Sequence, residues 1–394
     1  MTRVSLSCRI CEESQPLSPL SACPLCAGPL DVHYDWAQAP TFLERPAMWR
    51  YAELLPHAGS DSVPGGTPLV GAATFSEALG IDLHLKLESA NPTHSFKDRL
   101  ATSAVAAAEA FGLTTLCCAS TGHMGEALAS ACAAAGLEAV VLTPASDGSS
   151  QPAAPYGARN FDVRGTYEDC RRLELHLESL FPWGFLGGNL GTYATEGAKT
   201  ISYEIAEQLG AKAPDVVVSP LGSGTLFAKL AQGFAELAAL GLMNGSRPPR
   251  LYGAQAEGCP PVAMAWADER PLSRVTPDTV AQTLAVGDPT HGELAIGAAR
   301  MSGGGVVAVS EDRIMPCTEL LAETSGVYAD PAAGVALGAL LELVRTGEVA
   351  QGERVVLVVS GSPVERAPRD AASVRHEIDA DAESFLSALD VGSR

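Results

Sequence analysis

The sequence predicts an α/β protein with two domains built on parallel sheets and a small zinc-ribbon-like segment in front of them. Short apolar runs alternate with alanine-rich helical stretches from about Tyr51 onward, which indicates parallel sheets covered on both faces. The length of 394 residues exceeds one ordinary core and predicts two or three folded units. Four cysteines clustered near the start predict a small segment that is stabilised by a metal rather than by a core.

The first 36 residues are expected to form the zinc ribbon. Cys8, Cys11, Cys23 and Cys26 make two C-x2-C pairs separated by eleven residues. Four thiolates form a closed tetrahedral zinc site, so the metal would be structural rather than catalytic. The alternative is a set of reduced or redox-active cysteines, which the paired spacing disfavours.

The remaining elements follow from apolar runs and helical periodicity. Seven runs are expected to be strands: Leu83–Leu87, Thr115–Ala119, Ala139–Leu142, Val216–Ser219, Leu251–Ala254, Val306–Val309 and Val355–Val359. The expected helices are Lys97–Ala110, Gly125–Ala135, Tyr167–Leu180, Glu196–Leu209, Thr225–Leu240, Pro331–Arg345 and a C-terminal helix from Ala380. Thr143–Tyr156, which is rich in proline and small polar residues, is a candidate surface loop or lid.

The charge balance excludes two classes of partner. With 46 acidic residues against 26 Lys and Arg, the net charge is −20, which disfavours nucleic acid and an anionic membrane surface. Only Arg9 is basic between the first and last ribbon cysteines, so a nucleic-acid role for the ribbon is not expected. The sequence has no run of 18 apolar residues and no export signal in its first ten residues. We therefore expect a cytoplasmic protein with reduced thiols.

The segment Asn91–Arg99 contains the most informative lysine. Ser95 is a plausible N-cap, so Lys97 would lie in the first turn of a helix. An amine near the positive end of a helix favours its neutral, nucleophilic form. A lone lysine at a helix start is usually exposed and inert, so the accompanying motifs decide its interpretation.

Three further motifs follow predicted strands. Small residues in Pro220–Thr225, at the start of a helix, would let backbone amides approach a phosphate. The hydroxyls and glycines of Ala119–Gly125 suit a carboxylate. Ser360 follows a strand, where parallel α/β sheets bind their ligands. Taken singly, each motif is also consistent with an ordinary turn.

Taken in this order, the motifs resemble the threonine synthase family of fold-type-II enzymes, which depend on pyridoxal phosphate (PLP) and share the fold of the tryptophan synthase β subunit. Further matching segments are Gly65–Val70, Leu85–Glu88, Thr195–Ile201, Gln255–Gly258, Thr283–Pro289 and Asp330–Ala332. The resemblance covers nearly the whole chain, and some family members also begin with a zinc ribbon. It implies a large PLP-binding domain of residues 37–100 and 195–394, a small substrate domain of residues 101–194, and a homodimer.

The resemblance also implies a role for each site residue. Lys97 would hold the cofactor as a Schiff base and carry protons. The other cofactor-binding residues would be Gly222, Ser223, Gly224 and Thr225 at the phosphate, His123 at the 3-hydroxyl and Ser360 at the pyridine nitrogen. The substrate-binding residues would be Ser120, Thr121, Gly122, Met124, His94 and Ser95. The implied activity is that of a PLP-dependent lyase or synthase, by elimination or replacement on an amino acid.

Four positions depart from the family pattern. His123 stands where Asn is usual, His94 where Gly is usual, and Thr225 where a phosphate-loop Gly is usual. Ala194 replaces an Arg that helps to hold the substrate phosphate, and Ala cannot donate a hydrogen bond to it. We therefore expect an amino-acid substrate other than O-phosphohomoserine, in a specialised pathway. The alternatives are a true threonine synthase, which converts O-phosphohomoserine to threonine, and a PLP-binding protein without catalysis.

Overall fold

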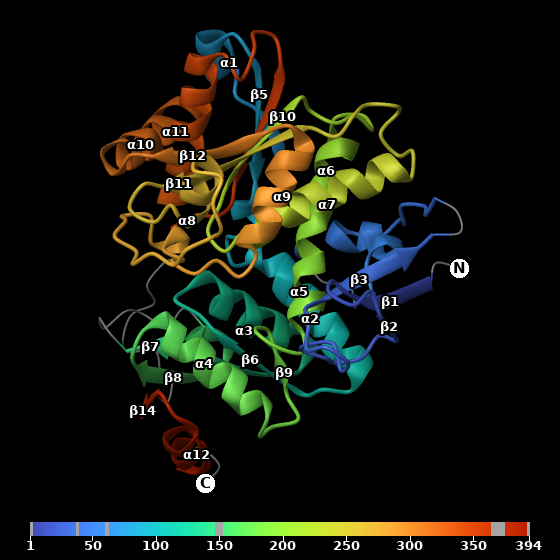
Figure 1. The fold of residues 1–394 in the computed structure, drawn as a ribbon, viewed down its shortest axis with the longest axis vertical. Helices are drawn as coiled ribbons and strands as arrows, with labels where there is room; N and C mark the ends of the chain where they lie inside the picture. The colour runs from blue at the N-terminus through green and yellow to red at the C-terminus, as the bar shows by residue number, and fades with distance from the viewer. Residues whose placement is uncertain (1–2, 37–38, 60–62, 146–152, 364–374, 392–394) are drawn as a thin grey trace. The chain divides into compact units, whose positions relative to one another are not determined.

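The chain divides into two compact units in the computed structural model, which describes residues 3–36, 39–59, 63–145, 153–363 and 375–391 (Figure 1). Unit one combines residues 1–64, 97–197 and 364–394, and unit two combines residues 65–96 and 198–363. The sequence predicts that residues 37–64 and 364–394 belong to the larger domain, and these domain bounds stay a prediction. Among the described residues, Arg375–Asp379 pairs with Arg159–Arg164 of unit one.

Unit two contains a six-stranded sheet in the order β12-β11-β10-β13-β5-β4. Its strands are β4 (Leu69–Gly71), β5 (Asp82–Leu87), β10 (Val216–Pro220), β11 (Arg250–Ala256), β12 (Gly305–Val309) and β13 (Arg354–Val359). All neighbours are parallel except β4 and β5, which pair antiparallel. The central strands β10 and β13 consist largely of buried Val and Leu, as expected for a parallel sheet covered on both faces.

Helices cover both faces of this sheet. The helices of unit two include α1 (Ala73–Leu79), α6 (Thr200–Gln208), α7 (Thr225–Ala239), α8 (Pro261–Ala267), α9 (Gly292–Ser302), α10 (Glu311–Ser325) and α11 (Pro331–Thr346). Tyr252 and Ala254 of β11 belong to the apolar cluster formed with α11. Gly253 between them faces Phe227 of α7, so α7 and α11 lie on opposite faces.

Unit one contains a five-stranded parallel sheet in the order β14-β8-β7-β6-β9. Its strands are β6 (Thr115–Ala119), β7 (Glu138–Pro144), β8 (Arg159–Arg164), β9 (Gly184–Phe185) and β14 (Arg375–Asp379). Its helices include α2 (Lys97–Phe111), α3 (His123–Ala135), α4 (Tyr167–Glu178), α5 (Gly191–Glu196) and α12 (Ala382–Val391). Cys118 and Val141 pack toward α2 and α3, whereas Cys117 and Val140 pack toward α4 and α12.

The N-terminal segment of unit one is a small antiparallel sheet in the order β2-β1-β3. Its strands are β1 (Arg3–Cys8), β2 (Ser14–Gln15) and β3 (Leu30–Asp35). Leu6 and Val32 share an apolar cluster with α2 and α3. The Tyr34 hydroxyl donates to Glu196 Oε2 at 2.6 Å, and the Tyr193 hydroxyl donates to the Ser18 carbonyl at 2.7 Å. The small sheet is therefore part of the unit one core rather than a separate appendage.

All seven expected strands are confirmed, and so are six of the seven expected helices. The expected helix Glu196–Leu209 is wrong in its continuity, because α5 ends at Glu196 and a short 3-10 turn, Gly197–Lys199, precedes α6. Half of the candidate loop Thr143–Tyr156, residues 146–152, lies outside the described residues. Among the helices that the structure describes, none has both the length and the apolar character needed to cross a bilayer.

Candidate active site

Three adjacent strands of unit two, β10, β13 and β5, run parallel, and each is followed by one of the candidate motifs. The loop Gly222–Thr225 follows β10, Ser360 follows β13, and the segment Asn91–Phe96 follows β5. Since the carboxyl ends of parallel strands meet at one edge of a sheet, the three motifs share that edge. This is the position at which open α/β sheets bind ligands.

Backbone hydrogen bonds join two of these motifs directly. Phe96 N donates to the Ser360 carbonyl at 3.0 Å, and Ser362 N donates to the His94 carbonyl at 3.0 Å. Ser95 forms an antiparallel bridge with Gly361 between them. Ser95 and Ser360 are buried. Lys97 is the next residue of the chain, and it opens α2 in unit one.

A buried polar network supports the segment that precedes Lys97. Asn91 Nδ2 donates to the Glu88 carbonyl and to Glu88 Oε2, both at 2.9 Å, and Asn91 Oδ1 accepts from Gly65 N at 2.9 Å. Lys86, whose side chain is fully buried, donates to Glu204 Oε2 at 2.7 Å. A buried polar group that loses its hydrogen-bond partner is costly, so this network favours one conformation of the loop.

His94 has the backbone conformation of a glycine. Its φ angle is +61°, in the left-handed region that few side chains adopt. Its Nδ1 lies 3.2 Å from the Ser89 carbonyl, which can only accept, so Nδ1 carries a proton in this contact. The ring is exposed and bonds back to its own loop. This explains why the resembled family uses Gly at the position.

The loop after β10 forms a cup at the start of α7, which we call the phosphate cup and define as Gly222–Thr225. Gly224 has a φ of +86°, and a Cβ there would lie 2.5 Å from the His291 carbonyl oxygen. The Ser223 and Thr225 hydroxyl oxygens are 3.0 Å apart, and Thr225 Oγ1 is 2.8 Å from His291 Nδ1. Hydroxyls, small residues and the N-terminus of a 15-residue helix fit a phosphate group well.

Two segments that match the family pattern, Thr283–Pro289 and Asp330–Ala332, contact each other near this edge. Asp330 caps α11 by accepting from Ala332 N at 2.9 Å, and its other oxygen accepts from the Thr283 hydroxyl at 2.8 Å. Asp330 N donates to the Gly361 carbonyl at 3.2 Å. These residues support the backbone beside Ser360, a function that motif matching alone does not show.

In unit one, the loop after β6 leads into α3. Ser120 Oγ accepts from Gly125 N at 2.8 Å and from Gly122 N at 3.1 Å, so this hydroxyl shapes the turn. Thr121 is exposed, and His123 is buried with 7% of its surface accessible. Met124 is half-buried and packs against the unit one core. The backbone amides at this helix start could still bind a carboxylate.

Glu174 of α4 is a buried acid that the sequence analysis does not identify. Its two oxygens accept from Ala119 N at 3.0 Å and from Gly187 N at 2.7 Å. Burial raises the pKa of its carboxyl to about 7. Ala119 directly precedes the Ser120 loop, so Glu174 fixes the backbone that enters the loop. The sequence feature that could identify Glu174 is its place on the apolar face of a helix, beside Cys170, Leu173 and Leu177.

Ala194 of α5 is buried in the apolar cluster of unit one, with 4% of its surface accessible. The same cluster holds Tyr193, Leu190 and residues of the ribbon. The position is therefore packed with apolar atoms, and nothing polar replaces the arginine of the family pattern at this residue.

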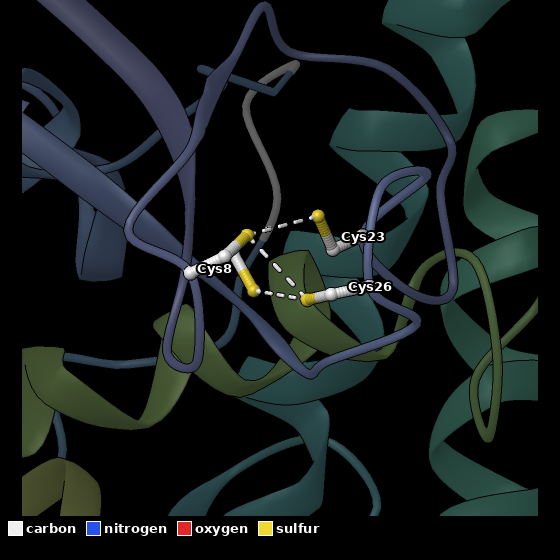
Figure 2. Close-up of side chains that lie close together, drawn as sticks. Cys8, Cys23 and Cys26 are labelled. Atoms are coloured by element: carbon white, nitrogen blue, oxygen red, sulfur yellow. Dashed lines mark hydrogen bonds between the residues drawn. The ribbon is translucent and has the colours of Figure 1, made fainter.

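The four ribbon cysteines converge, as Figure 2 shows for Cys8, Cys23 and Cys26. All four sulfur atoms lie within 4.8 Å of one another, and three of the separations are 3.4, 3.4 and 3.7 Å. Sulfur atoms around a tetrahedral zinc ion are about 3.8 Å apart, given Zn–S bonds of about 2.3 Å. Backbone N–H groups of Cys11 and Ile10 lower the pKa of the Cys8 thiol to about 6. The site is compatible with zinc.

Comparisons with known proteins identify the family of the chain. A family model described as a pyridoxal-phosphate dependent enzyme matches residues 61–361. The threonine synthase of Methanosarcina acetivorans is 36% identical over 352 residues, which is 86% of this chain and 86% of that protein. The threonine synthase of Mycobacterium tuberculosis is 35% identical over 320 residues, covering 79% of this chain and 86% of that protein.

Solved structures share the fold. Diaminopropionate ammonia lyase from Escherichia coli has a TM-score of 0.66 at 17% identity, covering 84% of this chain and 94% of that chain. A maize serine racemase has a TM-score of 0.64 at 20% identity, covering 76% of this chain and 90% of that chain. The family model matches most of the chain, and the two threonine synthases are at least 35% identical to it over most of its length. Both findings assign the chain to the same family. The chain belongs to the family of pyridoxal-phosphate-dependent enzymes, of fold type II, and is a threonine-synthase-like lyase or synthase.

Proposed function

We propose that the chain catalyses elimination or replacement at the side chain of an amino acid, with Lys97 as the residue that holds PLP and moves the substrate protons. The observation that carries this proposal is the shared edge of β10, β13 and β5. The phosphate cup, Ser360 and the segment that ends directly before Lys97 all lie at that edge.

The residues proposed to hold the cofactor divide by the part of it that they bind. The phosphate cup would take the phosphate through backbone amides and hydroxyls, and the Ser360 hydroxyl would donate a hydrogen bond to the pyridine nitrogen. His123 would bond the 3-hydroxyl. When bound, the cofactor supplies the electron sink that lets an amino acid lose the proton of its α-carbon. A neutral hydroxyl at the pyridine nitrogen moderates that sink, which favours elimination and replacement.

Lys97 would act on protons at its side-chain nitrogen, Nζ. It is the first residue of the 15-residue helix α2, whose positive end disfavours an ammonium ion and so favours the neutral amine. The neutral amine can accept the α-proton and return a proton at a later step. The amides at the start of α3, with Ser120, Thr121, Gly122 and Met124, would orient the substrate carboxylate, together with His94 and Ser95.

We infer a substrate whose side chain carries no phosphate, because Ala194 is packed in an apolar cluster where the family pattern has Arg. The rival substrate is O-phosphohomoserine, which the names of the curated relatives favour. An assay for phosphate release and threonine formation separates the two. Slow or no turnover is expected, and efficient turnover would establish a true threonine synthase.

Replacement of Lys97 by Ala tests the proposed role of the lysine, with Lys212→Ala as the matched control. Lys212 is an exposed lysine in unit two, so its loss should change neither cofactor binding nor turnover of the substrate found. Lys97→Ala should lower turnover by about 10²-fold or more, since proton transfer by one side chain contributes about 10²–10⁴-fold. Full activity of Lys97→Ala would overturn the proposal.

We further infer a structural zinc ion at the four ribbon cysteines and a homodimer in solution. The convergent sulfur atoms support the zinc, and the family resemblance supports the dimer. Metal analysis of the purified chain should find one zinc per chain, and light scattering should give twice the chain mass of 40.7 kDa.

A further inference from the structure

We propose that His291 is a positioning residue that turns the hydroxyls of the phosphate cup toward a bound phosphate. This inference rests on the proposed function of the cup, Gly222–Thr225, as the phosphate site. In this proposal His291 acts on the phosphate through the Thr225 hydroxyl, and no motif in the sequence identifies it.

Backbone contacts hold His291 against the cup. Its N–H donates to the Ser223 carbonyl at 2.9 Å. Its own carbonyl lies against Gly224, so closely that a Cβ there would be 2.5 Å from the oxygen. His291 is also the N-cap residue directly before α9, so the cup and this helix both constrain its position. None of these contacts depends on the imidazole ring.

The ring continues a chain of three polar side chains. His291 Nδ1 lies 2.8 Å from Thr225 Oγ1, and Thr225 Oγ1 lies 3.0 Å from Ser223 Oγ. Both hydroxyls belong to the cup, and Thr225 is the first residue of α7. Three groups at these separations form two hydrogen bonds, and the proton on Nδ1 decides their direction.

The two directions differ in what they offer an anion. If Nδ1 has no proton, it accepts from the Thr225 hydroxyl, Thr225 accepts from Ser223, and both hydroxyl protons point along the chain. If Nδ1 carries a proton, it donates to Thr225, and the hydroxyl protons can turn toward an acceptor in the cup. A phosphate presents only acceptors when it is fully ionised, so it selects the second arrangement.

The central hydroxyl of this chain of hydrogen bonds comes from Thr225, a position at which the resembled family has Gly. A hydroxyl at the helix start adds a donor to the cup, but only when no neighbouring group already accepts its proton. His291 meets that condition when its Nδ1 carries the proton. Thr225 and His291 therefore act as one unit, and we expect their substitutions to be non-additive.

Titration of PLP into the full-length chain freed of cofactor tests the inference, followed by absorbance. His291→Ala and His291→Phe lack the donor and should bind PLP about ten- to a hundredfold more weakly, which is the range for a hydrogen bond to a charged group. His291→Asn keeps an N–H donor near the place of Nδ1 and should bind within about threefold of the parent. His33→Ala, at an exposed histidine of the ribbon, is the matched control and should bind like the parent.

Thr225→Val shows whether the ring acts through the hydroxyl. In that background, addition of His291→Ala should weaken binding by less than about twofold, because the connecting hydroxyl is already lost. The phosphorus NMR signal of the bound cofactor should shift in His291→Ala and return toward the parent position in His291→Asn. Thermal unfolding of each cofactor-free variant establishes that it is folded.

Two outcomes would overturn the inference while leaving the proposed function intact. The first is a parent chain that binds PLP together with a His291→Ala variant that binds it equally well. The second is an equal loss from His291→Ala with and without the Thr225 hydroxyl. Failure of the parent chain to bind PLP at all would instead refute the proposed function.

Discussion

His94 and Glu174 both adopt states that their sequence surroundings do not indicate. His94 adopts a left-handed backbone at an exposed position beside the buried Ser95, and Glu174 keeps a carboxyl in an apolar layer. A left-handed backbone and a buried carboxyl are each unfavourable alone, and the neighbouring structure explains both. His94 continues the turn that leads to Ser95, and Glu174 satisfies two backbone amides beside the Ser120 loop.

Replacement of His94 by Gly should raise the free energy of unfolding by about 1 kcal/mol. A left-handed residue with a Cβ costs about 1–2 kcal/mol, and the loss of the contact with Ser89 offsets part of the gain. Chemical denaturation of both proteins measures the change. His94→Ala is the control, since it keeps the strain and loses the ring, and it should be less stable than the parent. A Gly variant less stable than the Ala variant would contradict this explanation.

Glu174 should make the stability of the chain depend on pH. Burial raises the pKa of its carboxyl from 4.5 to about 7, with Arg171 opposing and Glu178 adding to the rise. Between pH 4.5 and 7 the folded chain holds a proton that the unfolded chain releases. The stabilisation is therefore complete below pH 4.5 and is lost as the pH rises through 7.

Denaturation of the parent and of Glu174→Gln across this pH range measures that contribution. The parent should lose up to about 3 kcal/mol more than the variant between pH 4.5 and pH 7.5. The variant has one acceptor for two amide donors, so it should be the less stable protein at low pH. Parallel curves for the two proteins would show that Glu174 has no raised pKa.

Among the elements, the parallel strands were the most predictable because they are buried on both faces. Val216–Pro220 and Arg354–Val359 contain the apolar runs Val216–Val218 and Val355–Val359, and the expected bounds differ from the observed ones by one residue. Arg159–Arg164 was missed because charged ends and Asn160 interrupt its pattern, although Phe161 and Val163 are fully buried. The pairing of β14 with β8 joins residues more than two hundred positions apart, which no local pattern specifies.

The break between α5 and α6 follows from a contact that the sequence does not display. A Cβ on Gly197 would lie 2.1 Å from the Arg99 carbonyl oxygen, so only Gly lets this turn approach α2. Gly197→Ala should lower the free energy of unfolding by about 2–3 kcal/mol or more, because a backbone atom cannot move aside as the end of a side chain can. Thermal or chemical unfolding measures the cost.

Gly297→Ala is the matched control for that prediction. Gly297 lies inside α9, and a Cβ there would meet nothing within 4 Å. Ala should stabilise this helix by about 0.5–1 kcal/mol. Equal effects of the two substitutions would refute the role of close packing at Gly197.

At the scale of the whole molecule, the order of the motifs indicates the family more clearly than any single motif does, and the site residues stay a prediction. The segments that contain Ser223 and Ser360 and the segment directly before Lys97 are far apart in the sequence. Because β10, β13 and β5 are neighbours in the sheet, these segments lie at one edge. His291, Asp330 and Glu174 could not be predicted as parts of this scaffold, because each acts through a contact across elements. The pattern of residues within one segment of the sequence does not show contacts with other elements.

The ribbon should stabilise unit one through its metal. Leu6, Val32 and Tyr34 belong to the unit one core, so loss of the ribbon fold would expose that core to water. Removal of zinc by a chelator, or Cys23→Ser, should lower the unfolding temperature of the chain by about 10 °C or more. Calorimetry with and without added zinc measures the shift. An unchanged unfolding temperature in a chain shown to have lost its zinc would contradict a structural role.

The most direct test of the central claim is to locate the cofactor on the chain. The protein loaded with PLP is reduced with borohydride, digested, and sequenced by mass spectrometry. We predict that the modified peptide contains Lys97 and that the modification is on this residue. Attachment at Lys86, Lys199, Lys212 or Lys229, or no attachment in a protein saturated with PLP, would contradict the account.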